Sequence, residues 1–176
     1  MAGLSGTPRP AQPEQSAEPR PAALSHLDER GAAHMVDVTE KQTTKRTAIA
    51  AGALRTAAHV VELISRGGLP KGDALATARV AGILAAKRTS DLIPLCHQLA
   101  LTGVDVEFTV GKSDIDIVAT VRSTDRTGVE MEALTAVSVA ALTLYDMIKA
   151  VDPAARIDDV RVLRKEGGKT GSWVRG

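Results

Sequence analysis

Alternating apolar and polar positions mark two strands in the middle of the chain. The apolar members of the first run are Val104, Val106, Phe108 and Val110, and those of the second are Ile115, Ile117, Ala119 and Val121. Alternation with a period of two places every second side chain on one face of a sheet. A Gly-Lys-Ser-Asp connection separates the runs, so this region predicts an antiparallel hairpin.

Other segments have the periodicity or composition of helices and strands. Thr127 followed by Glu130 offers a capping box for the longest helix, and Pro153 stops it. The remaining pattern predicts a strand over 45–54, helices over 57–68 and 73–87, the long helix to about Val151, and a strand over 157–163. This order indicates an α+β fold, an antiparallel sheet packed against helices.

Composition divides the chain into a tail and one domain. Residues 1–24 are rich in Pro and Ala without a regular apolar period, which is typical of a disordered tail. We expect a truncation of this tail to leave folding and turnover intact. Residues 25–176 have the length of one ordinary domain.

Charge and residue usage disfavour several classes of function. A net charge of +1 and 2% aromatic residues give neither the basic field nor the stacking surface of a nucleic-acid-binding protein. The sequence has no uninterrupted run of the roughly 20 apolar residues that a membrane-spanning helix needs, which predicts no membrane partner. The single Cys96 predicts no internal disulfide, and its spacing from the four histidines is not that of a zinc site. These features favour the cytoplasm.

The long helix has apolar residues on more faces than one core contact needs. They are Leu134, Val137, Val139, Ala140, Leu142, Leu144, Tyr145, Met147, Ile148 and Val151. Part of this surface is therefore expected to meet another subunit, which predicts a homo-oligomer.

Ionisable residues gather near two helix ends. Asp146 and Lys149 are three residues apart, which places them on one helix face. A surface ion pair is the common interpretation of such spacing. The apolar helix around them instead predicts partial desolvation, which alters proton affinity as acid-base catalysis requires. Lys71 precedes another helix, where backbone N–H groups attract anions, although a solvated loop lysine is the simpler interpretation.

Several separate motifs, in order, resemble the cyclic pyranopterin monophosphate synthases, the molybdenum-cofactor biosynthesis protein C family. The resemblance covers about residues 34 to 171. The motifs are HMVDVTEK at 34–41, KGDALATARVAGILAAKRTSDLIPLCH at 71–97, GVEMEALTA at 128–136, LTLYDMIKAVD at 142–152 and EGGKTG at 166–171. The resemblance implies a ferredoxin-like fold and a hexamer built as a trimer of dimers, with an active site shared across a dimer interface.

The resemblance also implies which residues act. It aligns Lys71, Asp146 and Lys149 with the family's catalytic set. It implies substrate contacts for Leu95, Cys96, His97, Met131, Glu132 and Arg46. Without the resemblance, an exposed strand arginine is an equally good interpretation of Arg46. A packed side chain is then the more common interpretation of a lone histidine such as His97. Glu130 competes as a helix cap, and Cys96 has no identifiable activating base, so neither is assigned a catalytic role.

The activity implied is that of a lyase. It converts (8S)-3',8-cyclo-7,8-dihydroguanosine 5'-triphosphate to cyclic pyranopterin monophosphate and diphosphate during molybdenum-cofactor biosynthesis. The sequence requires no cofactor, although Mg²⁺ can accompany the substrate triphosphate. A noncatalytic oligomeric regulator that binds a nucleotide is the alternative. An RNA-binding ferredoxin-like domain is disfavoured because the predicted strands lack paired aromatic residues.

Overall fold

The computed structural model describes residues 32–169 and 171–176. The predicted tail over 1–24 lies outside the described residues. The larger compact unit is Met35–Gly176. Its elements are β1 (Thr44–Arg55), α1 (Ala58–Ser65), α2 (Ala74–Ala86), α3 (Thr89–Leu92), β2 (Leu101–Val110), β3 (Asp114–Asp125), α4 (Glu130–Ile148), β4 (Arg156–Glu166) and β5 (Trp173–Val174).

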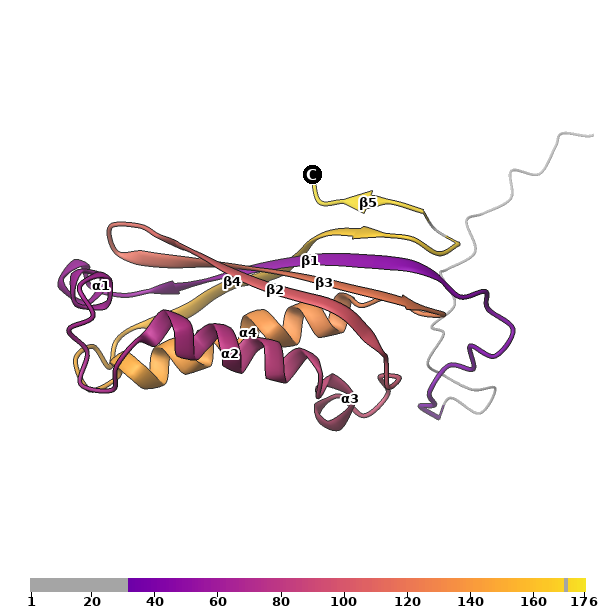
Figure 1. The fold of residues 1–176 in the computed structure, drawn as a ribbon, viewed down its shortest axis with the longest axis horizontal. Coiled ribbons are helices and arrows are strands. Elements are labelled where there is room, and N and C mark those ends of the chain that lie inside the picture. The colour runs from indigo at the N-terminus through magenta and orange to yellow at the C-terminus, as the bar shows by residue number, and fades with distance from the viewer. Residues whose placement is uncertain (1–31, 170) are drawn as a thin grey trace, which may run out of the picture. The chain divides into compact units, whose positions relative to one another are not determined.

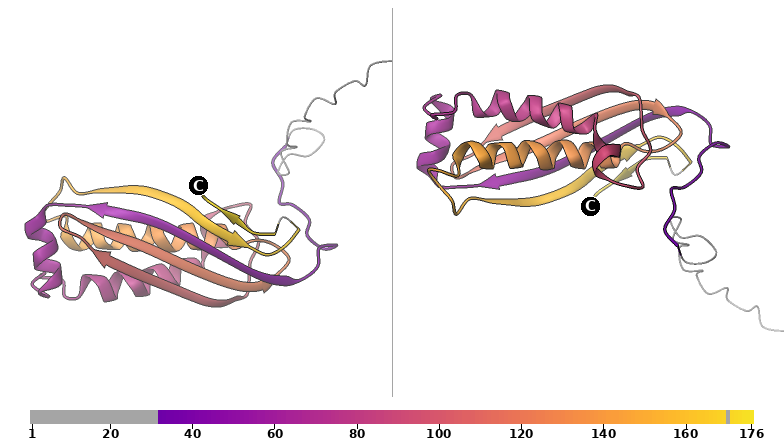
Figure 2. Two further views of the ribbon diagram at one scale, coloured as in Figure 1. Left: turned by 90° about the horizontal axis from the view of Figure 1, so that it is seen from above. Right: turned by 90° about the horizontal axis from the view of Figure 1, so that it is seen from below.

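One sheet and one layer of helices make up this unit. The strand order is β2-β3-β1-β4-β5, and every neighbouring pair is antiparallel. Helices α2 and α4 lie side by side against the same face of the sheet (Figure 1 and Figure 2). The predicted α+β class, an antiparallel sheet packed against helices, is confirmed. The elements before β5 run β-α-α-α-β-β-α-β, so three helices stand where the ferredoxin-like β-α-β-β-α-β order has one. The ferredoxin-like fold stays a prediction.

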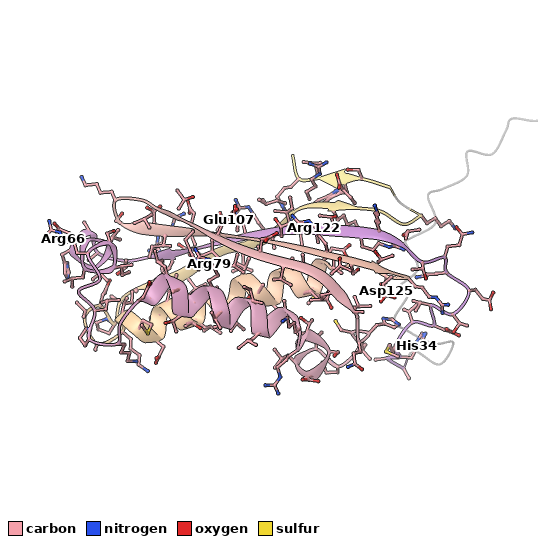
Figure 3. All side chains as sticks on the ribbon, in the orientation of Figure 1. His34, Arg66, Arg79, Glu107, Arg122 and Asp125 are labelled. Carbon is pink, nitrogen blue, oxygen red and sulfur yellow. The ribbon has the colours of Figure 1, made fainter. Side chains whose placement is uncertain are left out.

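The core fills the space between the sheet and the helix layer. Burial alternates along β3 as predicted, and Ile117 there is fully buried, whereas β1 is buried at every position from Ala50 to Leu54. Helix α2 approaches α4 closely at Gly82, where an added Cβ would lie 2.9 Å from the backbone oxygen of Ala136. Arg79, labelled in Figure 3, ties α2 to the sheet because its Nε donates to the carbonyl of Val106 at 3.0 Å.

The ends of the helices correct one prediction and support another. Asp73 caps α2 as its side chain accepts from the amide of Ala76 at 3.0 Å. The predicted capping box of α4 is wrong, because the N-cap residue is Val129, whose side chain makes no capping hydrogen bond. Glu130 instead pairs with Lys165 at 3.0 Å. The carboxylate thus joins the helix start to β4.

Other boundaries also differ from the sequence prediction. Helix α4 ends at Ile148 rather than at Val151. Strand β4 is longer than predicted and contains an irregularity where Asp159 adopts a φ of 60°. The short elements α3 and β5 were not predicted. Four and two residues respectively carry too little periodicity to be recognised.

Helix α4 has the length and composition of a membrane span, with 19 residues and a mean hydropathy of 1.4. The sequence argument against any such segment did not anticipate this. However, 56% of the apolar window is buried inside the fold, and the core helix of a globular domain passes the same test. Its packing against both the sheet and the neighbouring α2 accounts for its composition.

Candidate functional site

Lys71, Asp146 and Lys149 form an ion cluster at the C-terminal end of α4. The Nζ atom of Lys71 lies 2.7 Å from Oδ2 of Asp146, and the Nζ atom of Lys149 lies 2.7 Å from Oδ1. Lys71 also donates to the backbone oxygen of Asp146 at 2.9 Å. The structure therefore brings together the three residues that the resemblance assigned to catalysis, and each carboxylate oxygen holds one ammonium group.

The cluster is open to solvent in a single chain. The side chains of Lys71, Asp146 and Lys149 are 46%, 54% and 53% exposed, so the predicted desolvation is wrong for the isolated subunit. Hydrogen bonds from Lys149 and Lys71 lower the pKa of Asp146 to about 2. The carboxylate in turn raises the pKa of Lys149. At neutral pH the cluster consists of one carboxylate between two ammonium groups.

Leu95, Cys96, His97, Met131 and Glu132 lie near the other end of α4. The first three belong to the segment between α3 and β2, and the last two to the first turn of α4. Nε2 of His97 lies 2.7 Å from the carbonyl oxygen of Val36. Burial and the nearby carboxylate of Glu132 raise the pKa of the Cys96 thiol. A raised thiol pKa disfavours a thiolate nucleophile, in agreement with the sequence interpretation.

Glu132 is the buried acid of this end. Only 4% of the residue is exposed, and its Oε2 atom has no hydrogen-bond partner in the part of the chain that the structure describes. Burial, reinforced by Glu130, raises the pKa of Glu132 to about 7. An unpaired buried carboxyl oxygen carries a desolvation cost that a ligand N–H group can relieve.

Arg46 lies on a basic cavity of about 400 Å³ at the same end of the fold. Its Nε and Nη2 atoms donate to the backbone oxygens of Asp125 and Arg126, each at 3.3 Å. Asp125, labelled in Figure 3, marks this end of the sheet. The cavity is lined by Lys41, Arg46, Thr47, Arg126, Thr127, Gly128, Glu130, Lys165, Glu166, Gly167 and Lys169. Five of these side chains are cationic, which suits a polyanion.

Sequence reasoning missed Arg126 and Lys165. Their cavity positions depend on the pairing of β1 with both β3 and β4, which brings three segments distant in sequence together. The GGK sequence over 167–169 follows β4 directly. Lys169 lines the cavity.

The two groups of residues do not meet within one subunit. Met131 and Asp146 are 15 residues apart on α4, which at about 1.5 Å per residue is roughly 22 Å. Figure 2 shows α3 at one end of the helix layer and α1 at the other. Lys71 follows α1, whereas Leu95 to His97 follow α3. One chain therefore carries two separate groups of candidate residues, the two candidate half-sites, at opposite ends of α4.

Among residues 32–169 and 171–176, no three His, Cys, Asp or Glu side chains are grouped so that they could hold a metal ion. The charged groups described above are predominantly cationic, and they favour an anionic ligand.

A family model described as the MoaC family matches residues 35–168. The chain belongs to the MoaC family. The match covers almost the whole of the larger compact unit and nearly the same residues as the resemblance found from the sequence motifs. The nine candidate site residues predicted from the sequence, from Arg46 to Lys149, lie inside the matched range.

MoaC relatives similar to this chain carry one functional name. Cyclic pyranopterin monophosphate synthase 2 of Mycobacterium tuberculosis is 83% identical over 156 residues, which are 89% of this chain and 93% of that protein. Cyclic pyranopterin monophosphate synthase of Streptomyces coelicolor is 59% identical over 172 residues, 98% of this chain and 99% of that protein. The enzyme of that name from Chloroflexus aggregans is 57% identical over 154 residues, 86% and 93% of the two chains.

Proposed function

We propose that this chain is the lyase that converts (8S)-3',8-cyclo-7,8-dihydroguanosine 5'-triphosphate to cyclic pyranopterin monophosphate and diphosphate in molybdenum-cofactor biosynthesis. The observation that carries the proposal is the identity of 83% and 59% to two synthases of that name over most of their length. The ion cluster at one end of α4 and the basic cavity at the other supply the acid-base groups and the polyanion site that such a reaction uses.

The ion cluster carries the proton transfers in this proposal. Asp146 has a pKa of about 2 and is therefore a carboxylate at neutral pH, while Lys149 is an ammonium group with a raised pKa. Lys149 donates a proton to the opening ring, and Asp146 holds both lysines in place and accepts a proton as the ring recloses. Lys71 stabilises developing negative charge.

The other end of α4 binds the substrate. Arg46 and the neighbouring cations of the 400 Å³ cavity hold the triphosphate. The free Oε2 atom of Glu132 accepts a hydrogen bond from an N–H group of the heterocycle, next to Leu95, Cys96, His97 and Met131. Mg²⁺, where present, enters with the triphosphate rather than as a resident ion.

A complete site requires two copies of the chain, because the half-sites are roughly 22 Å apart along α4. A two-fold axis near the middle of α4 would exchange the two ends of the helix. It would bring Lys71, Asp146 and Lys149 of one copy to Arg46 and Glu132 of the other. The substrate would then lie between two subunits, which would also desolvate the exposed ion cluster.

The outer surface of the helix layer supports this arrangement. Four large apolar side chains on its helices are more than half exposed: Val80, Leu84, Leu92 and Leu142. An apolar groove of about 410 Å³ lies among α2, α3 and Val139, with the Arg88–Asp91 ion pair beside it. Burial of one Leu side chain contributes about 1.5 to 3 kcal/mol, so a second copy packed here stabilises the pair. We extend the proposal to a hexamer of three such dimers, in the cytoplasm, without nucleic-acid or membrane partners.

Incubation of the purified protein with the cyclised nucleotide tests the function. The proposal expects stoichiometric release of diphosphate and formation of the cyclic monophosphate. Binding of the nucleotide without diphosphate release would instead identify the alternative, a noncatalytic regulator. Failure to bind it would exclude both.

A further inference from the structure

A glycine turn after β4 lies directly against Arg46. Gly167 and Gly168 have φ angles of 98° and 72°, which residues with a side chain rarely adopt. A Cβ atom built on Gly168 would overlap Nη1 of Arg46 and would lie 2.6 Å from its Cζ. The guanidinium therefore occupies the space that any side chain at position 168 would need.

Three backbone groups surround the Arg46 side chain. The carbonyls of Asp125 and Arg126 accept from Nε and Nη2, each at 3.3 Å, and Gly168 lies beside Nη1. A guanidinium has five N–H donors. The two on Nη1 have no hydrogen-bond partner among residues 32–169 and 171–176. They remain available to a ligand.

Arg46 also lines two cavities. One has a volume of about 400 Å³ and the other about 440 Å³, and both linings include Lys41, Arg46 and Lys169. The orientation of this guanidinium therefore affects both spaces. Bidentate recognition of a phosphate group depends on that orientation, because the guanidinium donors form a rigid planar fork.

We propose that Gly168 is a positioning residue for Arg46: the absence of a side chain at this position lets the guanidinium lie against the turn with free donors for a polyphosphate. The proposal rests on the proposed function in one respect, the assignment of the cavity to the substrate triphosphate. A substitution at Gly168 displaces the end of a flexible side chain and leaves the sheet intact. Gly167 differs, because a Cβ there would overlap the backbone oxygen of Lys45.

Gly171 offers a matched control for backbone strain. Its φ angle is 67°, close to the 72° of Gly168, and a Cβ added there would meet nothing within 4 Å. Gly171→Ala therefore introduces the same kind of strain without touching Arg46. Any difference between the two variants reports the contact with the guanidinium rather than the cost of a left-handed alanine.

The experiment is a double-mutant cycle on the full chain. Inorganic triphosphate is the probe, and its dissociation constant is measured by calorimetry for wild type, Gly168→Ala, Gly171→Ala, Arg46→Ala and the Arg46→Ala/Gly168→Ala double variant. Because a hydrogen bond to a charged group contributes roughly tenfold or more to affinity, Gly168→Ala should weaken triphosphate binding by about tenfold. Gly171→Ala should stay within about twofold of wild type. In the Arg46→Ala background the Gly168 substitution should change the affinity by less than about twofold.

A general structural role for Gly168 would weaken binding equally in both backgrounds, and that result would overturn the inference. Unchanged affinity in Gly168→Ala, or no binding to wild type, would also overturn it. Should Gly168→Ala fail to fold, Gly168→Asn with Gly171→Asn as control gives the same comparison, since Asn tolerates positive φ. Turnover of wild type is measured in parallel. Its absence would refute the proposed function, whereas the triphosphate affinities would still decide the role of Gly168.

Discussion

Asp146→Asn removes the charge that organises the ion cluster while keeping the size of the side chain. In the wild type, each carboxylate oxygen of Asp146 lies 2.7 Å from the ammonium nitrogen of one lysine. An asparagine keeps one acceptor oxygen and presents an NH₂ donor to the other ammonium group. One lysine therefore loses its partner, and the variant loses the proton acceptor as well. Lys149 also loses the interaction that raises its pKa.

We expect kcat to fall by about 10² or more, the usual effect of removing a positioned acid or base. The Michaelis constant should change less than kcat, because in the proposed site the cations around Arg46 and the carboxyl group of Glu132, rather than Asp146, hold the substrate. Since the pKa of Asp146 is about 2, wild-type turnover between pH 5 and pH 8 should show no loss from protonation of this group. These ion pairs are about half exposed in the single chain and contribute little to its folding, so the variant subunit should fold.

Diphosphate release under saturating substrate measures kcat, and light scattering confirms that the variant still assembles. Asp105→Asn is a suitable control, because Asp105 forms an exposed ion pair with Arg122 at 2.5 Å on the sheet. This control should retain near-normal turnover. If Asp146→Asn were equally active, Asp146 would be excluded from catalysis and only its structural ion pair would remain.

Three further predictions address the other half-site and the interface. The pKa of Glu132 is raised from 4.5 to about 7, so the folded state binds the proton more tightly. The free energy of unfolding should therefore fall by about 3 kcal/mol as the pH rises from 4.5 to about 7, at 1.36 kcal/mol per pKa unit. Chemical denaturation at pH 5 and pH 8 should show most of this fall in the wild type and none of it in Glu132→Gln. Cys96→Ser should keep most of its turnover, and abolished turnover with intact assembly would indicate a nucleophilic thiol. Leu84→Glu should be monomeric by light scattering and inactive in the diphosphate assay, whereas Val110→Glu, at the end of β2, should still assemble and turn over substrate. An active Leu84→Glu monomer would contradict the shared site.

The fold class was predictable because its signals are local. Strict alternation over β2 and β3 identified the hairpin, and the helical pattern over 73–87 predicted α2 to within about one residue at each end. The capping box of α4 was wrong because Glu130 had a stronger partner in Lys165, a residue on a distant strand. Tertiary pairing of this kind overrides a local motif and leaves no trace in the local pattern.

Within the candidate site, the contact between Asp146 and Lys149 was predictable from the sequence, but the spatial arrangement of the other candidate residues was not. The spacing of Asp146 and Lys149 correctly indicated one helix face, and their ion pair is present. Their exposure was mispredicted because the apolar residues around them face the core, leaving this end of α4 in solvent. The contribution of Arg126 and Lys165 to the basic cavity follows from strand register, which a single sequence does not specify.

Complementation between two inactive variants tests most directly whether one active site uses two copies of the chain. Asp146→Asn and Arg46→Ala are each assayed below saturation, alone and after being refolded together in equal amounts. In a mixed dimer one site carries both lesions and the other carries neither. With random pairing, half of the dimers are mixed and half of their sites are intact, so about a quarter of wild-type activity should return. Activity no greater than the mean of the two separate variants, in a preparation shown to contain mixed dimers, would contradict the shared site.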